Sequence, residues 1–267
     1  MKEVHYDYIR TSVVAEHVVE VRINRPEARN ALTMAVLDEL SAAFDSAVED
    51  LGARVVILAG EGKSFCAGAD LFAVHNAELS DRNEVGFGHA RLWEQLGVLD
   101  VPVIAAVQGH AITGGLHLAL CCDLIVATED AVFQDTHARL GLIPGSGEPQ
   151  RTSRRAGIFA AREIMLTSRP FTADEARDMG LVSRVVPGSE LRDAALRLAQ
   201  EIADNNPRAV RYIKKMLNGG WGRPYGEAQW EDTLLNWGGR LNAQPDADAL
   251  ERMRTFRERS HRKAGTP

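Results

Sequence analysis

Cysteine is scarce in this sequence, and its placement excludes two kinds of site. Only three cysteines occur in 267 residues, and two of them, Cys121 and Cys122, are adjacent. Three such residues cannot build a disulfide framework, and no CxxC or HExxH spacing indicates a metal site. The sequence therefore predicts reduced, buried thiols and no metal. Cys66 is interpreted as a small packing residue and not as a nucleophile, because the sequence places no base beside it.

Long apolar runs and an excess of basic residues are also missing. No apolar stretch approaches the ~20 residues that a membrane-spanning helix needs, and residues 1–7 lack the apolar segment of a signal peptide. The net charge is −6 and the pI is ≈ 5.8, whereas binding to nucleic-acid phosphates requires a concentrated basic surface. We therefore expect a cytoplasmic protein that binds neither a membrane nor nucleic acid.

Two glycine-containing stretches only superficially match nucleotide-binding loops. Residues 60–64 lack the first glycine of a phosphate-binding loop, because Ile57 stands in its place. In residues 145–150, Gln150 replaces the third glycine of a dinucleotide fingerprint, and Pro149 is expected to prevent a helix from opening there. Neither a phosphate-binding loop nor a dinucleotide-binding loop is therefore predicted.

The sequence does contain two apolar strands that each run into glycines. Residues 55–58 lead to Gly68, which has small residues on either side, and residues 103–107 lead to Gly114 and Gly115, which open a helical pattern. Glycine allows backbone N–H groups to face a ligand with no side chain between them. Two such donors that converge on one oxygen form an oxyanion hole, and the sequence predicts one here.

The hydrophobic pattern elsewhere predicts an α/β protein. Helices are expected at residues 34–48, 87–99, 113–122, 160–166, 173–179, 191–203, 207–217 and within 225–261, and strands at 18–23, 55–59, 103–107, 124–127 and 131–133. Thr33 is expected to cap the first helix, and residues 134–147 to form a long loop. The aromatic stripe that includes Trp230 and Trp237 should be covered by the core or by a partner subunit.

The residues around the two glycine sites also resemble a known family. The stretch Phe65-Cys66-Ala67-Gly68-Ala69-Asp70-Leu71, with Ile23-Asn24-Arg25-Pro26, Cys122-Asp123-Leu124 and Gly141-Leu142-Ile143-Pro144-Gly145, closely resembles the enoyl-CoA hydratase/isomerase (crotonase) superfamily. The resemblance implies a crotonase-like spiral of β-β-α units at residues 1–200. It implies a C-terminal α-helical trimerisation region at residues 201–267, and hence a homotrimer or hexamer.

The resemblance further implies the substrate class and the site residues. It implies an acyl-CoA thioester substrate, no separate cofactor, and an oxyanion hole made by the N–H groups of Ala69 and Gly114. Coenzyme A contacts are implied for Arg25, Ala28, Ala67, Asp70 and Leu71 and, from a neighbouring subunit, for Phe256 and Arg259. For Arg259, the alternative is that it is one member of a solvated basic helix face and contacts no coenzyme A.

The sequence departs from the family where two glutamates activate water. By position, the resemblance places His117 and His137 there. Imidazole has a reference pKa of ~6.5 against ~4.3 for glutamate. Two close imidazoles cannot both be protonated cheaply, so one is expected to act as a neutral base while the other carries a proton. The alternative is a pair of packed core histidines.

Three functions are consistent with these residues. The first is an enoyl-CoA hydratase-like enzyme that activates water with the histidine pair. The second is a C–C bond hydrolase of a cyclic β-diketone, similar to the 6-oxocamphor hydrolase branch of the superfamily. Ser146 stands where that branch carries an acidic residue, and Asp135 or Glu148 could replace it as an orienting carboxylate. The third is a non-catalytic acyl-CoA-binding oligomer.

Overall fold

The computed structural model describes residues 6–70, 90–241, 251–255 and 257. Its main sheet has six strands in the order β1 (Ile9–Ala15), β2 (Val18–Ile23), β3 (Val55–Gly60), β4 (Val103–Val107), β6 (Leu124–Thr128) and β9 (Arg184–Val186). β1 is antiparallel to β2, and the later neighbours are parallel. A second sheet holds β5 (His110–Ile112), β7 (Val132–Gln134) and β8 (Phe171–Thr172). The expected α/β class is confirmed.

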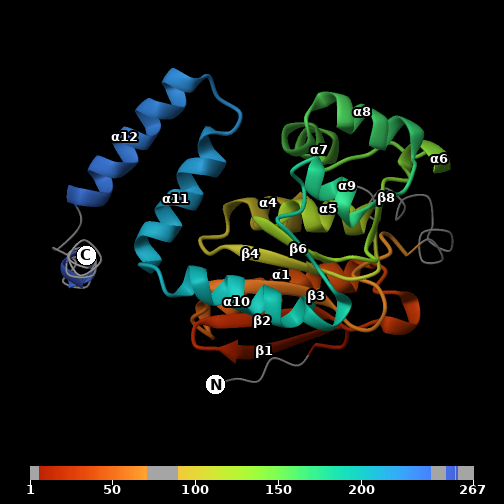
Figure 1. Cartoon of the computed structure of the whole chain (residues 1–267), viewed down its shortest axis with the longest axis horizontal. Helices are drawn as coiled ribbons and strands as arrows, with labels where there is room; N and C mark the ends of the chain where they lie inside the picture. Colours follow the sequence, from red (N-terminus) through yellow and green to blue (C-terminus); the bar gives the residue numbers. More distant parts are fainter. Residues whose placement is uncertain (1–5, 71–89, 242–250, 256, 258–267) are drawn as a thin grey trace, which may run out of the picture. The chain divides into compact units, whose positions relative to one another are not determined.

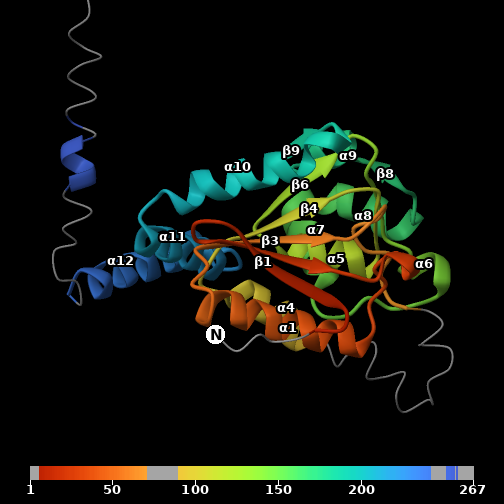
Figure 2. The same cartoon turned by 90° about the horizontal axis from the view of Figure 1, so that it is seen from below.

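Helices cover both faces of the six-stranded sheet, as Figure 2 shows. On one face lie α1 (Met34–Glu49), α4 (Ala90–Val98) and α5 (Gly114–Cys121), and on the other lies α10 (Leu191–Ala203). Every residue of β3 and of β4 is therefore buried, which is why both strands read as continuous apolar runs. Within the described residues, no helix is both long and apolar enough to cross a membrane.

After β4 the chain passes back and forth between the two sheets, and Figure 1 labels β4 and β6 of the main sheet and β8 of the second. β4 is followed by β5 and then α5, while β6 is followed by β7 and then by α6 (His137–Leu140), α7 (Glu148–Ala156) and α8 (Ile158–Thr167). After β8, α9 (Ala173–Asp178) leads back to β9 in the main sheet. This strand, strand, helix order is the expected spiral. It gathers the loops after β3, β5 and β7 in one place.

Several local expectations are corrected. Residues 134–147 are not all loop, because α6 begins at His137. Pro149 does not prevent a helix, since it lies in the first turn of α7, where the missing N–H would have no partner. β1, β5, β8 and β9 were not predicted, while Thr33 caps α1 as expected by accepting from the N–H of Val36. The expected start of a helix at residue 87 lies outside the described residues.

Packing divides the chain into two units, Met1–Ala203 and Asp204–Pro267. In the first unit, a short 3-10 helix, η2 (Gly188–Glu190), precedes α10. In the second unit, α11 (Pro207–Gly220) contacts α12 (Tyr225–Leu241). The rings of Trp230 and Trp237 on α12 meet edge to face with centroids 6.2 Å apart, yet these residues are 58% and 54% exposed. The described part of α12 therefore presents an apolar stripe that its own unit does not cover.

The three thiols are structural. Cys66, Cys121 and Cys122 are free and buried. Burial raises the pKa of Cys66 to about 12, so its thiol stays protonated at neutral pH and is a poor nucleophile. The interpretation of Cys66 as a packing residue is confirmed.

Candidate active site

Two glycines let the loop after β3 pack directly against β5 and α5. Cys66 forms a parallel bridge with Ala111 in β5. An added Cβ on Gly68 would lie 2.5 Å from the carbonyl oxygen of Ile112, and one on Gly115 would lie 2.1 Å from the carbonyl oxygen of Cys66. Gly68 also has a φ of +86°, which residues with a side chain rarely adopt. Only glycine fits at either position, so backbone meets backbone here.

The same close packing brings the two predicted oxyanion donors together. A Cβ on Gly114 would lie 3.6 Å from the backbone nitrogen of Ala69, and a Cβ on Gly68 would lie 3.3 Å from that of Gly114. Within the described part of the chain, neither Ala69 nor Gly114 donates its N–H to any acceptor. Gly114 is also the first residue of α5, whose helix dipole adds positive potential. Two such donors can stabilise one developing oxyanion.

Thr113 fixes the position of Gly114 in a strained conformation. Its φ of 51° and ψ of −105° are unusual for a β-branched residue and cost about 1–3 kcal/mol. The N–H of Thr113 donates to the carbonyl oxygen of Gln134 at 2.7 Å, and its hydroxyl lies 2.5 Å from that of Thr136. Thr113 thus ties the oxyanion donor to the segment that carries His137. The sequence analysis missed this residue, whose only signal was a threonine before two glycines.

His117 is buried in the middle of α5 and is held by an arginine that the sequence analysis also missed. Nη1 of Arg151 lies 3.0 Å from Nε2 of His117, while Nη2 donates to the carbonyl oxygen of Trp93 at 3.3 Å. The ring of Trp93 lies over that of His117 with centroids 4.5 Å apart. Because a guanidinium can only donate, Nε2 of His117 must accept, and the ring proton lies on Nδ1.

This environment keeps His117 neutral. Its pKa is lowered to about 3, first by burial and then by the positive charges of Arg151 and His137. At neutral pH His117 can neither carry a proton as an imidazolium nor accept one at Nε2. The expectation that two histidines divide the acid and base roles stays a prediction, and a neutral His117 favours His137 as the residue that would take the proton.

Acid unfolding should report the neutral state of His117. The unfolded side chain takes up a proton below its ordinary pKa of 6.5, whereas the folded one does so only near pH 3. Stability from this group is therefore present above about pH 6.5 and is lost as the pH falls, by up to about 1.4 kcal/mol per pH unit. When the free energy of unfolding is measured with denaturant at several pH values between 4 and 7, it should depend less steeply on pH in His117→Gln than in wild type. Equal slopes would contradict the assignment.

His137 opens α6 beside a buried carboxylate. Its backbone N–H donates to Oδ1 of Asp135 at 2.9 Å, and its Nδ1 lies 3.2 and 3.1 Å from the two oxygens of that side chain. Burial would raise the pKa of Asp135, but the hydrogen bonds from the ring and backbone of His137 lower it overall. An ionised Asp135 accepts from Nδ1–H, which leaves the lone pair of Nε2 on His137 free to accept a proton.

Glu148, the first residue of α7, completes the cluster. Its Oε2 lies 3.7 Å from Nδ1 of His137. Burial, then the charge of Asp135 and a hydrogen bond with it, raise the pKa of Glu148 well above its ordinary value, although Arg151 opposes this. The two carboxyl groups named as possible orienting residues from the sequence thus both reach His137. Ser146 is not needed for that contact.

The residues expected to bind coenzyme A lie on two adjacent segments. Nη2 of Arg25 pairs with Asp70 at 3.2 Å, so these two charges neutralise each other. Ala28 ends the short helix η1 (Pro26–Ala28), and the N–H groups of Ala28 and Ala67 already donate to the carbonyl oxygens of Arg25 and Arg29. A hydrogen bond from Ala28 or Ala67 to a nucleotide would therefore have to use the carbonyl oxygen, and that of Ala28 already accepts from the N–H of Ala31 at 3.1 Å. Leu71, Phe256 and Arg259 lie outside the described residues.

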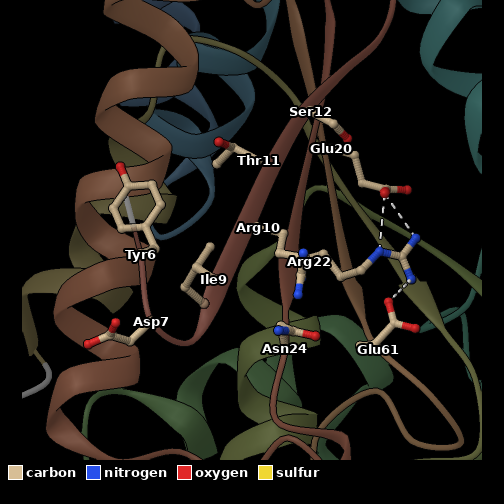
Figure 3. A pocket seen from close by; sticks show the side chains of 10 residues that line it. All are labelled: Tyr6, Asp7, Ile9, Arg10, Thr11, Ser12, Glu20, Arg22, Asn24 and Glu61. Carbon is tan, nitrogen blue, oxygen red and sulfur yellow. Dashed lines mark hydrogen bonds and ion pairs between the residues drawn. The ribbon is translucent and has the colours of Figure 1, made fainter. Parts of the chain in front are cut away.

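A surface hollow is separate from this cluster (Figure 3). It has a volume of ≈ 760 Å³ and is lined mainly by residues of β1 and β2, with Glu61 at one edge. At its centre Arg22 contacts Glu20 at 2.9 Å and Glu61 at 3.5 Å. None of the predicted catalytic residues lines it, so the chemistry is assigned to the ends of the strands and not to this hollow.

Known proteins with related sequences and structures match this chain over most of its length. A family model described as enoyl-CoA hydratase/isomerase matches residues 14–257. A probable peroxisomal enoyl-CoA hydratase 1 from Arabidopsis thaliana is 40% identical over 203 residues, 76% of each chain. A short-chain-enoyl-CoA hydratase from Clostridium acetobutylicum is 38% identical over 204 residues, 76% of this chain and 78% of its own. The crystal structure of an enoyl-CoA hydratase from Bacillus anthracis has a TM-score of 0.89 at 34% identity, covering 95% of this chain and 97% of its own.

Proposed function

Because the chain belongs to the enoyl-CoA hydratase/isomerase family, we propose that it adds water to the double bond of an enoyl-CoA thioester. The observation that carries this proposal is that the N–H groups of Ala69 and Gly114 have no acceptor among the described residues and are tied through Thr113 to the segment of His137. Negative charge appears on the thioester oxygen only as the reaction proceeds. Donors fixed in advance at that oxygen therefore stabilise the transition state more than the substrate.

In the proposed reaction, His137 handles the proton. Its Nε2 accepts a proton from water while the water oxygen bonds to Cβ of the substrate. The electron pair of the double bond moves to give an enolate, whose oxygen accepts from the N–H groups of Ala69 and Gly114. The imidazolium of His137 then returns the proton to Cα, so that one water is added overall. His117 contributes a neutral Nδ1–H donor and transfers no proton.

Hydration of crotonyl-CoA by the purified protein tests this function. We expect the absorbance of the conjugated thioester to decrease as a 3-hydroxyacyl-CoA forms, with free coenzyme A acting as a competitive inhibitor. A protein that binds coenzyme A but hydrates no enoyl-CoA of any chain length would be the non-catalytic acyl-CoA binder instead.

The contact between His137 and Asp135 favours one second candidate, C–C bond hydrolysis of a cyclic β-diketone. A single oriented base can deliver water to a carbonyl carbon, and the same two N–H groups would hold the tetrahedral oxyanion. Collapse of this adduct breaks the C–C bond, and the imidazolium protonates the carbon that leaves. A hydrolase of a free diketone would turn it over without coenzyme A, whereas the hydratase requires the thioester.

We further propose that the apolar stripe of α12 is an interface between copies of this chain. Trp230 and Trp237 are more than half exposed and Leu234 is 48% exposed, which is unusual for a group of large apolar side chains. Light scattering at micromolar concentration is expected to give the mass of a homotrimer or hexamer. A stable monomer would contradict this assembly.

A further inference from the structure

His137 faces two buried carboxyl groups at once. Asp135 is 1% exposed and Glu148 is 2% exposed, and both approach Nδ1 of the same imidazole. Two ionised carboxylates that are buried close together repel each other, and sharing one proton relieves that repulsion. We propose that Asp135 and Glu148 share one proton and act together as positioning residues for His137. The inference rests on the proposed role of His137 as the base.

The shared proton belongs mainly to Glu148. Oε1 of Glu148 is buried and has no hydrogen-bond partner within the described residues, so a negative charge on this carboxyl group would be left unsatisfied there. Asp135, in contrast, accepts from both the ring and the backbone of His137. The pKa directions agree, because burial and the charge of Asp135 raise that of Glu148 while the hydrogen bonds from His137 lower that of Asp135.

Two charges oppose protonation of Glu148, but both are outweighed. The start of α7 favours a carboxylate, but this effect of the helix dipole is small. Arg151 also favours ionisation, but it is shared with His117 and with the carbonyl oxygens of Ser146 and Trp93. Burying a second unpaired carboxylate costs more than these two effects return. The neutral carboxyl group is therefore the favoured form of Glu148.

One negative charge opposite His137 suits a base better than two. The charge of Asp135 stabilises the imidazolium that forms when His137 takes a proton from water, and it holds the ring in the tautomer with Nε2 free. One ionised carboxylate is enough to hold the ring in this tautomer, and a second buried charge beside it would only repel Asp135. The proton on Glu148 thus removes that repulsion and leaves Asp135 to orient His137.

A divalent cation is the competing occupant of this cluster. One ligand atom from each of Asp135, His137 and Glu148 lies within 4.8 Å of the others. A cation would require both carboxyl groups to be ionised, whereas a shared proton requires one to be neutral. Metal analysis of protein purified without chelators separates the two. Stoichiometric metal, or activity lost in EDTA and restored by a divalent cation, would overturn the proposal.

Infrared spectroscopy of the intact protein tests the proton directly. At neutral pH we expect the carbonyl stretch of one protonated carboxylic acid in the wild type, and its loss in Glu148→Gln. Glu20→Gln is the matched control, because Glu20 is equally buried but ion-paired with Arg22, so the band should remain. No such band in the wild type, or a band that survives in Glu148→Gln, would overturn the proposal without depending on any enzyme assay.

Kinetics separate this inference from the proposed function. Asp135→Asn removes the charge and should lower kcat by about 10²-fold or more with little change in KM, whereas Glu148→Gln keeps a neutral donor to Asp135 and should lower kcat less than 10-fold. If His137→Gln is inactive and Glu148→Gln is equally inactive, the shared proton is wrong while the proposed base stands. If His137→Gln is fully active, the proposed role of His137 as the base is wrong, whatever the result for Glu148→Gln.

Discussion

Replacing His137 by glutamine should lower kcat for hydration by about 10²- to 10⁴-fold, because glutamine can form hydrogen bonds but cannot take a proton from water. KM should change little, since the thioester oxygen is held by backbone donors. The rate is measured on purified protein with crotonyl-CoA or with the substrate that the wild type turns over fastest. His117→Gln is the matched comparison and should cost less, because Arg151 already occupies the acceptor nitrogen of His117.

The pH profile distinguishes one base from a pair. For wild type, kcat/KM should fall on the acid side, because general-base catalysis requires an unprotonated base. His117→Gln should keep that acid limb, because the pKa of His117 is about 3 and it does not titrate in the range where imidazoles usually do. An acid limb that disappears in His117→Gln would contradict the single base. A His137→Gln variant with wild-type activity would remove this histidine from the chemistry.

Removing either oxyanion donor should cost about 3–4 kcal/mol of transition-state stabilisation, or roughly 10²- to 10³-fold in kcat. Ala69→Pro removes one N–H, and the preceding Gly68 has no side chain to clash with the proline ring. Gly114→Pro removes the other at the first residue of α5, where proline is tolerated. The strained Thr113 precedes Gly114, so Ala69→Pro is the cleaner variant, and circular dichroism should accompany both.

Gly97→Ala serves as the control for these substitutions. An added Cβ at Gly97 meets nothing within 4 Å, so this variant should fold and turn over substrate as wild type does. A folded Ala69→Pro protein with unchanged kcat would show that its N–H does not stabilise the reaction. The same result for a folded Gly114→Pro protein would remove the oxyanion hole from the mechanism altogether.

The parts of the fold that could be predicted are those set by local or periodic signals. Helix α1 follows from its capping threonine, Thr33, and from its apolar spacing, while β3 and β4 follow from apolar runs that match burial on both faces. The three residues of β5 and the two of β8 could not be predicted, because such short strands exist only through their pairing with β7. The helix at Glu148 was missed because Pro149 was weighed as a breaker without its position in the first turn.

The sequence by itself predicted where two backbone segments with free N–H groups would meet. Backbone segments pass close to one another at Gly68, Gly114 and Gly115. Because such contact favours glycine, it can be recognised from the sequence alone. The resemblance to the family pointed to His117 and His137 as the residues that would activate water, and to Asp135 and Glu148 as possible orienting carboxylates. Matching positions are sufficient for these predictions, because they concern position and not charge.

Only the tertiary structure decided which groups surround each histidine. Ionisation depends on burial and on neighbouring charges, and these come from residues distant in the sequence. Arg151 reaches His117 across 34 residues and occupies its acceptor nitrogen, while Asp135 leaves Nε2 of His137 free. Two histidines that look equivalent in the sequence thus have different neighbours, because the fold places a guanidinium at Nε2 of His117 and carboxyl groups at Nδ1 of His137.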